Sequence, residues 1–252
     1  MNTFDRRNQI IELLKENGSV LVGDLSKRFN ISEVSIRTDL RVLEEQNLLV
    51  RFHGGARAIS NGENETYLDD RYLLSTDPKT RIAKAAAALI KEGDSIILDS
   101  GSTTMMIANE LLKIKNITVI TNNLPAAFVL SDSVDITLVV CGGYVRHKTR
   151  SMHGSITENT LKGIRADIMF VGADGVDFNV GLTTFNEGYG VSAVMAEVSS
   201  KVIAVVDSTK FNRNGFNLVL PMNKVDMIIT DNNIPIEAQE RLSKLKIDVK
   251  QV

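Results

Sequence analysis

The sequence predicts an α/β protein in two parts, a small unit of helices and a β-hairpin over residues 1–59 and a larger unit over residues 79–252. In the first part, helix-spaced apolar patterns are followed by short β-rich runs around a pair of glycines. In the second, strands of the buried type alternate with helical patterns, as in a sheet covered by helices. Residues 60–78 between them are polar and without apolar periodicity, which predicts a linker.

The composition is that of a globular protein, with 43% hydrophobic and 24% charged residues among 252. The formal net charge is -2, and residues 1–59 carry nine basic against eight acidic side chains. Binding of nucleic acid by bulk attraction is therefore excluded, and the positions of the cations must decide. A single cysteine, Cys141, permits no internal disulfide, and the sequence shows neither a signal peptide nor a membrane span. We expect a cytoplasmic protein without membrane contact.

Three helices are predicted in the first part. The first covers residues 5–16 and stops at Asn17 and Gly18. A short second helix ends at Asn30, and its apolar residues recur every four positions at Leu21, Leu25 and Phe29. The third begins after Ser32, which stands where an N-cap belongs.

The third helix has an apolar face and a polar one. Ile36, Leu40 and Leu43 would hold it to the other helices. Arg37 and Arg41 project from another face, as in a helix that contacts base edges in the major groove of DNA.

A wing is predicted next, with strands over residues 48–53 and 56–59 around Gly54 and Gly55. His53 is assigned no more than a phosphate contact. The residues predicted to contact double-stranded operator DNA are Ser32, Ser35, Arg37, Thr38, Arg41, Arg51, His53 and Arg57. The alternative is an ordinary interaction module whose charged helix faces are merely solvated.

The larger unit begins with a helix predicted over residues 80–91, and another is predicted over residues 105–112. Strands are predicted over residues 95–98, 117–120, 136–140, 168–171, 202–206 and 227–229.

Residues 99–104 pass from the first of these strands through a small polar loop into a helix. Helix N-termini carry unpaired N–H groups, so this loop predicts an anion site, with Asp99 placed to accept hydrogen bonds from hydroxyls beyond the anion. The alternative is a capped helix without a ligand. Polar and glycine-rich segments after other strands predict a common cleft. The predicted binding residues are Asp99, Ser100, Gly101, Ser102, Thr103, Thr104, Asn122, Asn123, Gly142, Gly143, Asp174 and Lys210.

Residues 6–57 and the loops of the larger unit resemble the DeoR family of transcription regulators. The resemblance implies an N-terminal winged helix-turn-helix and a C-terminal α/β sugar-phosphate sensor domain similar in fold to ribose-5-phosphate isomerase. It implies a repressor of a sugar or polyol operon, working as a dimer or tetramer and controlled by a phosphorylated sugar or polyol. Thr38 follows Arg37 where many members have a second arginine, so the operator sequence does not carry over. Residues 182–188 and 210–217 resemble a galactitol or amino-sugar subgroup.

A sugar-phosphate isomerase is the competing interpretation. Val171 stands where the resemblance would place one catalytic acid, and Ser192 where it would place the glutamate base. Glu187 or Glu197 could substitute for that base. No complete dinucleotide motif occurs, and His147 and His153 lack companion ligands, so neither a cofactor nor a metal is expected. We therefore predict binding without catalysis.

Overall fold

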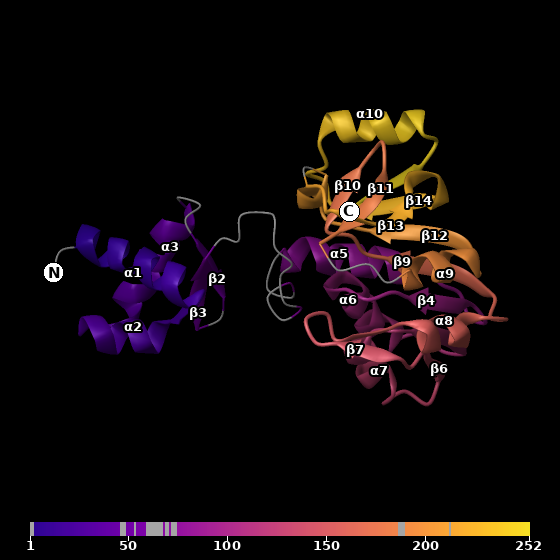
Figure 1. Ribbon diagram of the computed structural model, residues 1–252, viewed down its shortest axis with the longest axis horizontal. Coiled ribbons are helices and arrows are strands. Elements are labelled where there is room, and N and C mark those ends of the chain that lie inside the picture. The colour runs from indigo at the N-terminus through magenta and orange to yellow at the C-terminus, as the bar shows by residue number, and fades with distance from the viewer. Residues whose placement is uncertain are drawn as a thin grey trace. The chain divides into compact units, whose positions relative to one another are not determined.

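The structure is a computed structural model that describes residues 3–45, 49–52, 54–58, 68, 71, 75–185, 190–211 and 213–252. The chain divides into two compact units, Met1–Asn64 and Glu65–Val252 (Figure 1). The predictions for His53, for residues 186–188 and for most of the linker lie outside the described residues.

The smaller unit contains three helices and three short strands among its described residues. The helices are α1 (Thr3–Asn17), α2 (Val22–Phe29) and α3 (Glu33–Glu45). The strands are β1 (Ser19–Leu21), β2 (Leu49–Phe52) and β3 (Gly55–Ala58), in the antiparallel order β1-β3-β2. The three helices and the hairpin are confirmed. β1 was not predicted, and Leu21 ends this strand and precedes α2 instead of lying within the helix.

The helix boundaries of this unit follow from local chemistry. Asn30 ends α2 with φ 53°, a left-handed conformation that asparagine tolerates. Gly54 turns the hairpin with φ 93°, which a side chain would disfavour. The apolar faces of all three helices meet in one core, which buries Ile10, Leu14, Leu25, Ile36, Leu40 and Leu43.

The larger unit is built on a seven-stranded parallel sheet in the order β15-β14-β12-β9-β4-β5-β6. The strands are β4 (Ser95–Leu98), β5 (Ile117–Thr121), β6 (Ile136–Val140), β9 (Ala166–Val171), β12 (Ser199–Val205), β14 (Met227–Thr230) and β15 (Asp248–Gln251). All six predicted strands occur. β15 was missed because its residues are mostly polar, as is common for a strand at a sheet edge.

Helices cover both faces of this sheet (Figure 1). α5 (Thr76–Ala87), α6 (Ser102–Leu111) and α7 (Leu124–Leu130) pack on one face. α8 (Ser155–Leu161), α9 (Val191–Glu197) and α10 (Ile236–Lys244) pack on the other. The alternation of strand side chains separates the two cores, since Ile96 and Leu98 point to the first and Ile97 to the second. α5 begins four residues before the predicted start at residue 80, inside the predicted linker.

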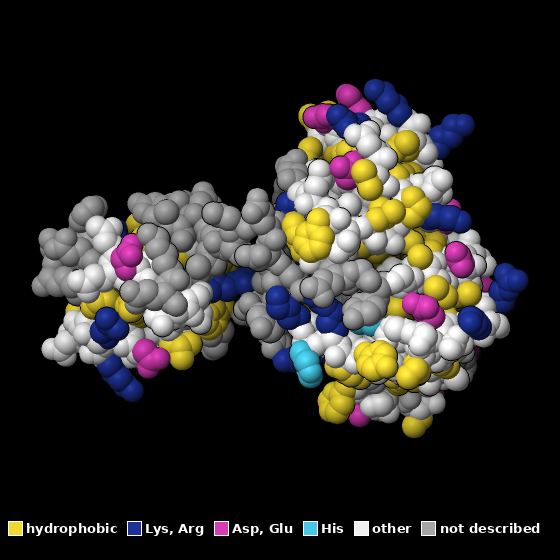
Figure 2. All heavy atoms as spheres, viewed as in Figure 1, with side chains coloured by type: hydrophobic (Ala, Val, Ile, Leu, Met, Phe, Trp, Pro, Cys, Tyr) yellow, Lys and Arg dark blue, Asp and Glu magenta, His cyan; other side chains and the backbone are white. Residues whose placement is uncertain are grey.

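Short elements complete the larger unit. A second sheet has the antiparallel order β10-β11-β13, from β10 (Gly175–Asp177), β11 (Gly181–Thr184) and β13 (Asn217–Pro221). β7 (Tyr144–Arg146) pairs with β8 (Ser151–His153), and two 3₁₀ turns are η1 (Ser208–Lys210) and η2 (Met222–Lys224). Figure 2 shows acidic and basic side chains interspersed on the drawn face of this unit.

The sheet order reverses between β4 and β9. From β4 the chain continues outward to β5 and β6, whereas from β9 it continues the other way to β12, β14 and β15. The loops after two such strands leave in opposite directions and open a crevice at the carboxyl ends of the strands. None of the helices that the structure describes is long and apolar enough to cross a bilayer.

Candidate DNA-binding and effector sites

The exposed face of α3 carries four side chains at helical spacing: Val34, Arg37, Thr38 and Arg41. Val34 is 69% exposed, so its methyl groups are accessible on this face. A protruding α3 with guanidinium, hydroxyl and aliphatic groups can contact phosphates, base edges and thymine methyl groups. Val34 was not predicted from the sequence to contact DNA, although its position one helical turn before Thr38 places it on the same face as the predicted contacts.

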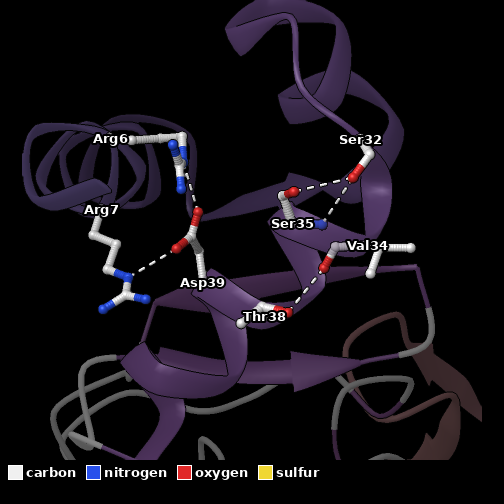
Figure 3. A network of polar contacts seen from close by, with 7 residues as sticks. All are labelled: Arg6, Arg7, Ser32, Val34, Ser35, Thr38 and Asp39. Atoms are coloured by element: carbon white, nitrogen blue, oxygen red, sulfur yellow. Dashed lines mark hydrogen bonds and ion pairs between the residues drawn. The ribbon is translucent and has the colours of Figure 1, made fainter. Parts of the chain in front are cut away.

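The start of α3 is capped as predicted. The Ser32 Oγ accepts a hydrogen bond from the Ser35 backbone N at 3.2 Å and lies 3.0 Å from the Ser35 Oγ (Figure 3). The Thr38 Oγ donates to the Val34 carbonyl at 3.0 Å. The cap orders the first turn of α3, which is where a recognition helix meets the bases.

A buried ion-pair cluster fixes the orientation of α3. The Asp39 carboxylate accepts from Arg6 Nε at 2.6 Å and from Arg7 Nε at 2.8 Å, and its side chain is 2% exposed (Figure 3). The two arginines come from α1, so this carboxylate clamps α3 to α1. Arg6 and Arg7 were missed, although a carboxylate between Ile36 and Leu40 on the buried side signals that a cation must be near.

Arg37 and Arg51, two of the arginines predicted to contact DNA, form exposed ion pairs. Arg37 Nη2 lies 2.6 Å from Glu33 Oε2, with 57% and 50% of the two side chains exposed. Such pairs contribute about 0–1 kcal/mol, less than the 1–3 kcal/mol of a good bidentate base contact. Arg51 Nε lies 2.9 Å from Glu44 Oε2, which ties β2 to α3, and Arg57 lies on β3, half-buried. Arg37 can therefore exchange its partner for DNA.

In the larger unit, a cavity of about 200 Å³ lies where the sheet order reverses. Asp99 and Ser100 follow β4, and Gly172, Ala173 and Asp174 follow β9. Further lining residues come from outside these loops: Arg71, His153, Thr184, Gly190, Ser192, Ala193, Leu218, Val219 and Pro221. This cavity therefore lies at the carboxyl ends of β4 and β9, with an apolar wall from β13. The predicted segments after β5 and β6 do not line it.

Asp99 is the buried polar centre of this cavity. Its carboxylate accepts from the Ser100 backbone N at 2.7 Å and from the Ser192 Oγ at 2.6 Å. Burial raises the pKa of Asp99, while these hydrogen bonds and one from Asn122 act against the rise. A carboxyl group held in this way can bind sugar hydroxyl groups.

A second, smaller cavity of about 10 Å³ lies at the N-terminus of α6. Gly101, Ser102 and Thr103 line it on the helix side, and Gly101 has φ 154°, which favours glycine. Three cations line it as well: Arg71, Lys79 and Lys210. The nearby acids are Asp207, which lines it, and Asp174, which lies 3.1 Å from Arg71 Nη2. A helix N-terminus with cations in excess is suited to an anion.

Burial lowers the pKa of two of these cations, Lys79 and Lys210. Burial, followed by the charge of Lys210, lowers the pKa of Lys79 to about 7, against the raising effect of Asp207 and Asp174. Neither Lys79 nor Arg71 was predicted. Lys79 could have been found, because it continues the apolar stripe of Ile82, Ala83 and Ala86 at helical spacing. Arg71 gave no such signal.

Five predicted binding residues line neither cavity and have internal roles. Thr104 Oγ donates to the Gly101 carbonyl, and Asn122 Nδ2 donates to the Met152 carbonyl. Asn123 caps α7 by accepting from Ala126 N. Thr157 Oγ donates to the carbonyl of Gly142. A Cβ at Gly143 would lie only 2.2 Å from Thr157 Oγ, so glycine is required there. These residues shape the loops around the site.

Among the described residues, the groups discussed for an isomerase are not arranged as acids and bases, and Glu187 lies outside the described residues. Val171 is buried at the end of β9, and Ser192 donates to Asp99. Glu197 is exposed on α9.

Comparison with known families agrees with both units. The family model for the DeoR-like helix-turn-helix domain matches residues 6–62, and that for the DeoR C terminal sensor domain matches residues 75–232. The chain belongs to the DeoR family. This DeoR-family chain is therefore a transcription regulator with a helix-turn-helix and a sensor domain, and not an enzyme.

Full-length relatives of the DeoR-family chain are named as repressors. A putative aga operon transcriptional repressor from Escherichia coli O157:H7 is 37% identical over 98% of this chain and 93% of its own length. The lactose phosphotransferase system repressor of Lactococcus lactis is 36% identical over 97% of each. Among solved structures, ribose 5-phosphate isomerase A from Methanocaldococcus jannaschii matches 54% of each chain with 23% identity and a TM-score of 0.41, which carries no argument about function.

Proposed function

We propose that this DeoR-family protein is a cytoplasmic repressor of a sugar or polyol operon. It binds paired operator half-sites as a dimer or tetramer, and it is controlled by a phosphorylated sugar or polyol. The observation that carries the effector assignment is the junction of the two cavities: hydroxyl-binding groups line the larger one, and cations with a helix N-terminus line the smaller one. The polarity of such a site matches a ligand with hydroxyls at one end and a phosphoryl group at the other.

Operator binding is assigned to α3 and the wing. Ser32, Ser35 and Thr38 would contact phosphates or base edges, and Arg37 and Arg41 would contribute most of the specific binding. Arg51, His53 and Arg57 would contact the backbone of adjacent DNA. A single unit makes few contacts, so strong operator binding needs two copies on related half-sites.

Effector binding is assigned to residues from five loops and helices. Ser102 and Thr103 at the N-terminus of α6 would bind the phosphoryl group together with Lys79 and Lys210. On the side of the larger cavity, the Asp99 carboxylate would accept hydrogen bonds from sugar hydroxyls, and the Ser192 hydroxyl would donate hydrogen bonds to them or accept from them. The names of the aga operon and lactose phosphotransferase repressors support a sugar-derived ligand.

The test is a DNA-binding assay on the promoter region next to the gene. Operator affinity is measured with the full chain at fixed salt, alone and with hexose, hexitol and amino-sugar phosphates. We expect one of these compounds to change operator affinity by about five- to 150-fold and to be recovered unchanged. Absence of any preference for the promoter over unrelated duplex contradicts the regulator; steady conversion of a sugar phosphate supports the isomerase instead.

A further inference from the structure

Arg71 belongs to the segment that joins the two units in sequence, between β3 and α5, yet its side chain lines the effector cavities. Arg71 Nη2 lies 3.1 Å from Asp174 Oδ1, and the Arg71 side chain is only 15% exposed. The backbone carbonyl of Arg71 accepts a hydrogen bond from Lys79 Nζ. Both the side chain and the backbone of Arg71 are therefore held by residues of the sensor unit.

A second residue of the same segment is also held there. Leu68 is 2% exposed, and its backbone N donates to the Lys148 carbonyl at 2.9 Å. Lys148 lies in the turn between β7 and β8, and β8 supplies His153 to the larger cavity. The segment that leads to the DNA-binding unit is thus attached at two points to elements that surround the effector site.

Arg71 lies at the boundary between the two cavities. Arg71, Gly172 and Ala173 line both of them, and Arg71 is the one of the three with a long side chain that can reorient. The smaller cavity, of about 10 Å³, has room for about one water molecule. A phosphoryl group entering at the N-terminus of α6 therefore requires lining side chains to shift, and Arg71 is the cation that also lines the larger cavity.

The partner of Arg71 is a well-held carboxylate. Asp174 Oδ2 accepts from Thr184 Oγ at 2.8 Å and from Phe185 N at 3.3 Å. Burial opposes its ionisation, but Arg71 and Lys210 lower the pKa of Asp174, so it stays charged. A phosphoryl group offers the guanidinium more acceptor oxygens than this carboxylate does and favours bidentate contact. Exchange of the guanidinium from Asp174 to a phosphoryl group replaces one charge-assisted contact by another, and Lys210 remains near the carboxylate.

We propose that Arg71 carries the effector signal to the DNA-binding unit: the bound phosphoryl group takes its guanidinium from Asp174 and displaces the segment joining the units. This rests on the proposed effector site. Without effector, the Arg71–Asp174 ion pair and the Leu68–Lys148 hydrogen bond hold the segment in one arrangement. With effector, the segment is released or repositioned, and the affinity for paired half-sites changes.

The first test needs no ligand. In the full chain, Asp174→Asn and Arg71→Gln each remove the ion pair, and Asp135→Asn, on an exposed residue paired with Lys115, is the matched control. We expect amide hydrogen exchange at Leu68, whose N–H donates to the Lys148 carbonyl, to rise at least tenfold in both variants, and operator affinity in Asp174→Asn to differ from that of the wild type. Wild-type exchange and affinity in both folded variants overturn the proposal. If Asp174→Asn lowers the melting temperature, its faster exchange could reflect general destabilisation, and the proposal is then judged on the exchange of Arg71→Gln.

The second test uses galactitol 1-phosphate, galactose 6-phosphate and glucosamine 6-phosphate as probes. For any probe that changes wild-type operator affinity, we expect Arg71→Gln to reduce that change to less than twofold, while Arg241→Gln, on exposed α10, retains it. Calorimetric titration separates lost transmission from lost binding. An undiminished response in Arg71→Gln overturns the proposal. If no probe binds the wild type, the proposed effector class fails, whereas the exchange experiment still decides the role of Arg71.

Discussion

Replacing Lys79 by methionine should stabilise the larger unit, because the folded chain holds this lysine against its preference for charge. Lys79 is 3% exposed, and its pKa is about 7 in the folded chain against an ordinary value of 10.5. The unfolded chain therefore binds the proton more tightly, and the difference corresponds to about 5 kcal/mol at low pH. Methionine keeps the aliphatic stem but loses the hydrogen bond to the Arg71 carbonyl, worth about 1 kcal/mol. We expect a net gain of about 3 kcal/mol at pH 7.

The pH dependence gives this prediction its sign. Below pH 7 both states hold the Lys79 proton and the penalty of the wild type is complete. Between pH 7 and 10.5 the folded chain holds Lys79 neutral, while the unfolded chain still keeps its proton. Wild-type stability should thus rise with pH in this window, and the advantage of Lys79→Met should shrink by about 1.4 kcal/mol per pH unit.

Urea denaturation followed by tyrosine fluorescence measures the effect selectively. The chain has no tryptophan, and its four tyrosines, at positions 67, 72, 144 and 189, all lie in the larger unit. The control is Lys84→Met on the exposed side of the same helix, which should change stability by less than about 0.5 kcal/mol. Equal or lower stability of Lys79→Met at pH 7, or a gain independent of pH, would refute the account of Lys79 as a cation kept for an anionic ligand.

Three other outcomes are expected. Arg37→Ala should weaken operator binding by about five- to 150-fold in gel-shift titration, because it removes one of the two exposed guanidinium groups on α3, whereas Arg241→Ala should not. Equal affinities of Arg37→Ala and the wild type would remove Arg37 from operator recognition. Asp39→Asn should destabilise the smaller unit by about 2–3 kcal/mol, because it leaves Arg6 and Arg7, both partly buried, without their carboxylate partner. Amide hydrogen exchange in α1 and α3 measures this loss, and unchanged protection would contradict the role of Asp39 in holding α3 to α1. Thr103→Val should weaken binding of the active sugar phosphate about tenfold in calorimetric titration, because it removes a hydroxyl from the smaller cavity. Binding of the same compound to the wild-type protein should weaken as the pH rises through about 7, because the phosphoryl group needs protonated Lys79. Binding that does not depend on pH would place the phosphoryl group elsewhere.

Local patterns account for most of the fold that could be predicted. Ser32 and the spacing of Ile36, Leu40 and Leu43 were sufficient for α3, because capping and one-sided apolar periodicity act within a few residues. The buried parallel strands were found for a similar reason, since both of their faces are apolar. β1, β10 and β15 are short or polar, and they depend on partners far along the chain.

The candidate effector site likewise contains residues that are adjacent in sequence and residues that come from distant segments. The loop from Asp99 to Thr103 was recognisable because a strand, a glycine turn and a helix start are adjacent in sequence. Arg71 was not, because it reaches this loop from 28 residues before Asp99. Ser192, 93 residues after Asp99, was placed near the site only by the family resemblance.

By itself, the sequence determined the two-part organisation, the third helix of the helix-turn-helix, the alternating α/β pattern and the strand–loop–helix segment over residues 95–111, all of which arise from interactions between near neighbours. Only the tertiary structure decided which strands flank the reversal of the sheet and which distant cations face α6. The tie between the joining segment and Asp174 also emerged only there. Burial and ion pairing depend on how far-apart segments pack, and one sequence without its fold does not specify those distances.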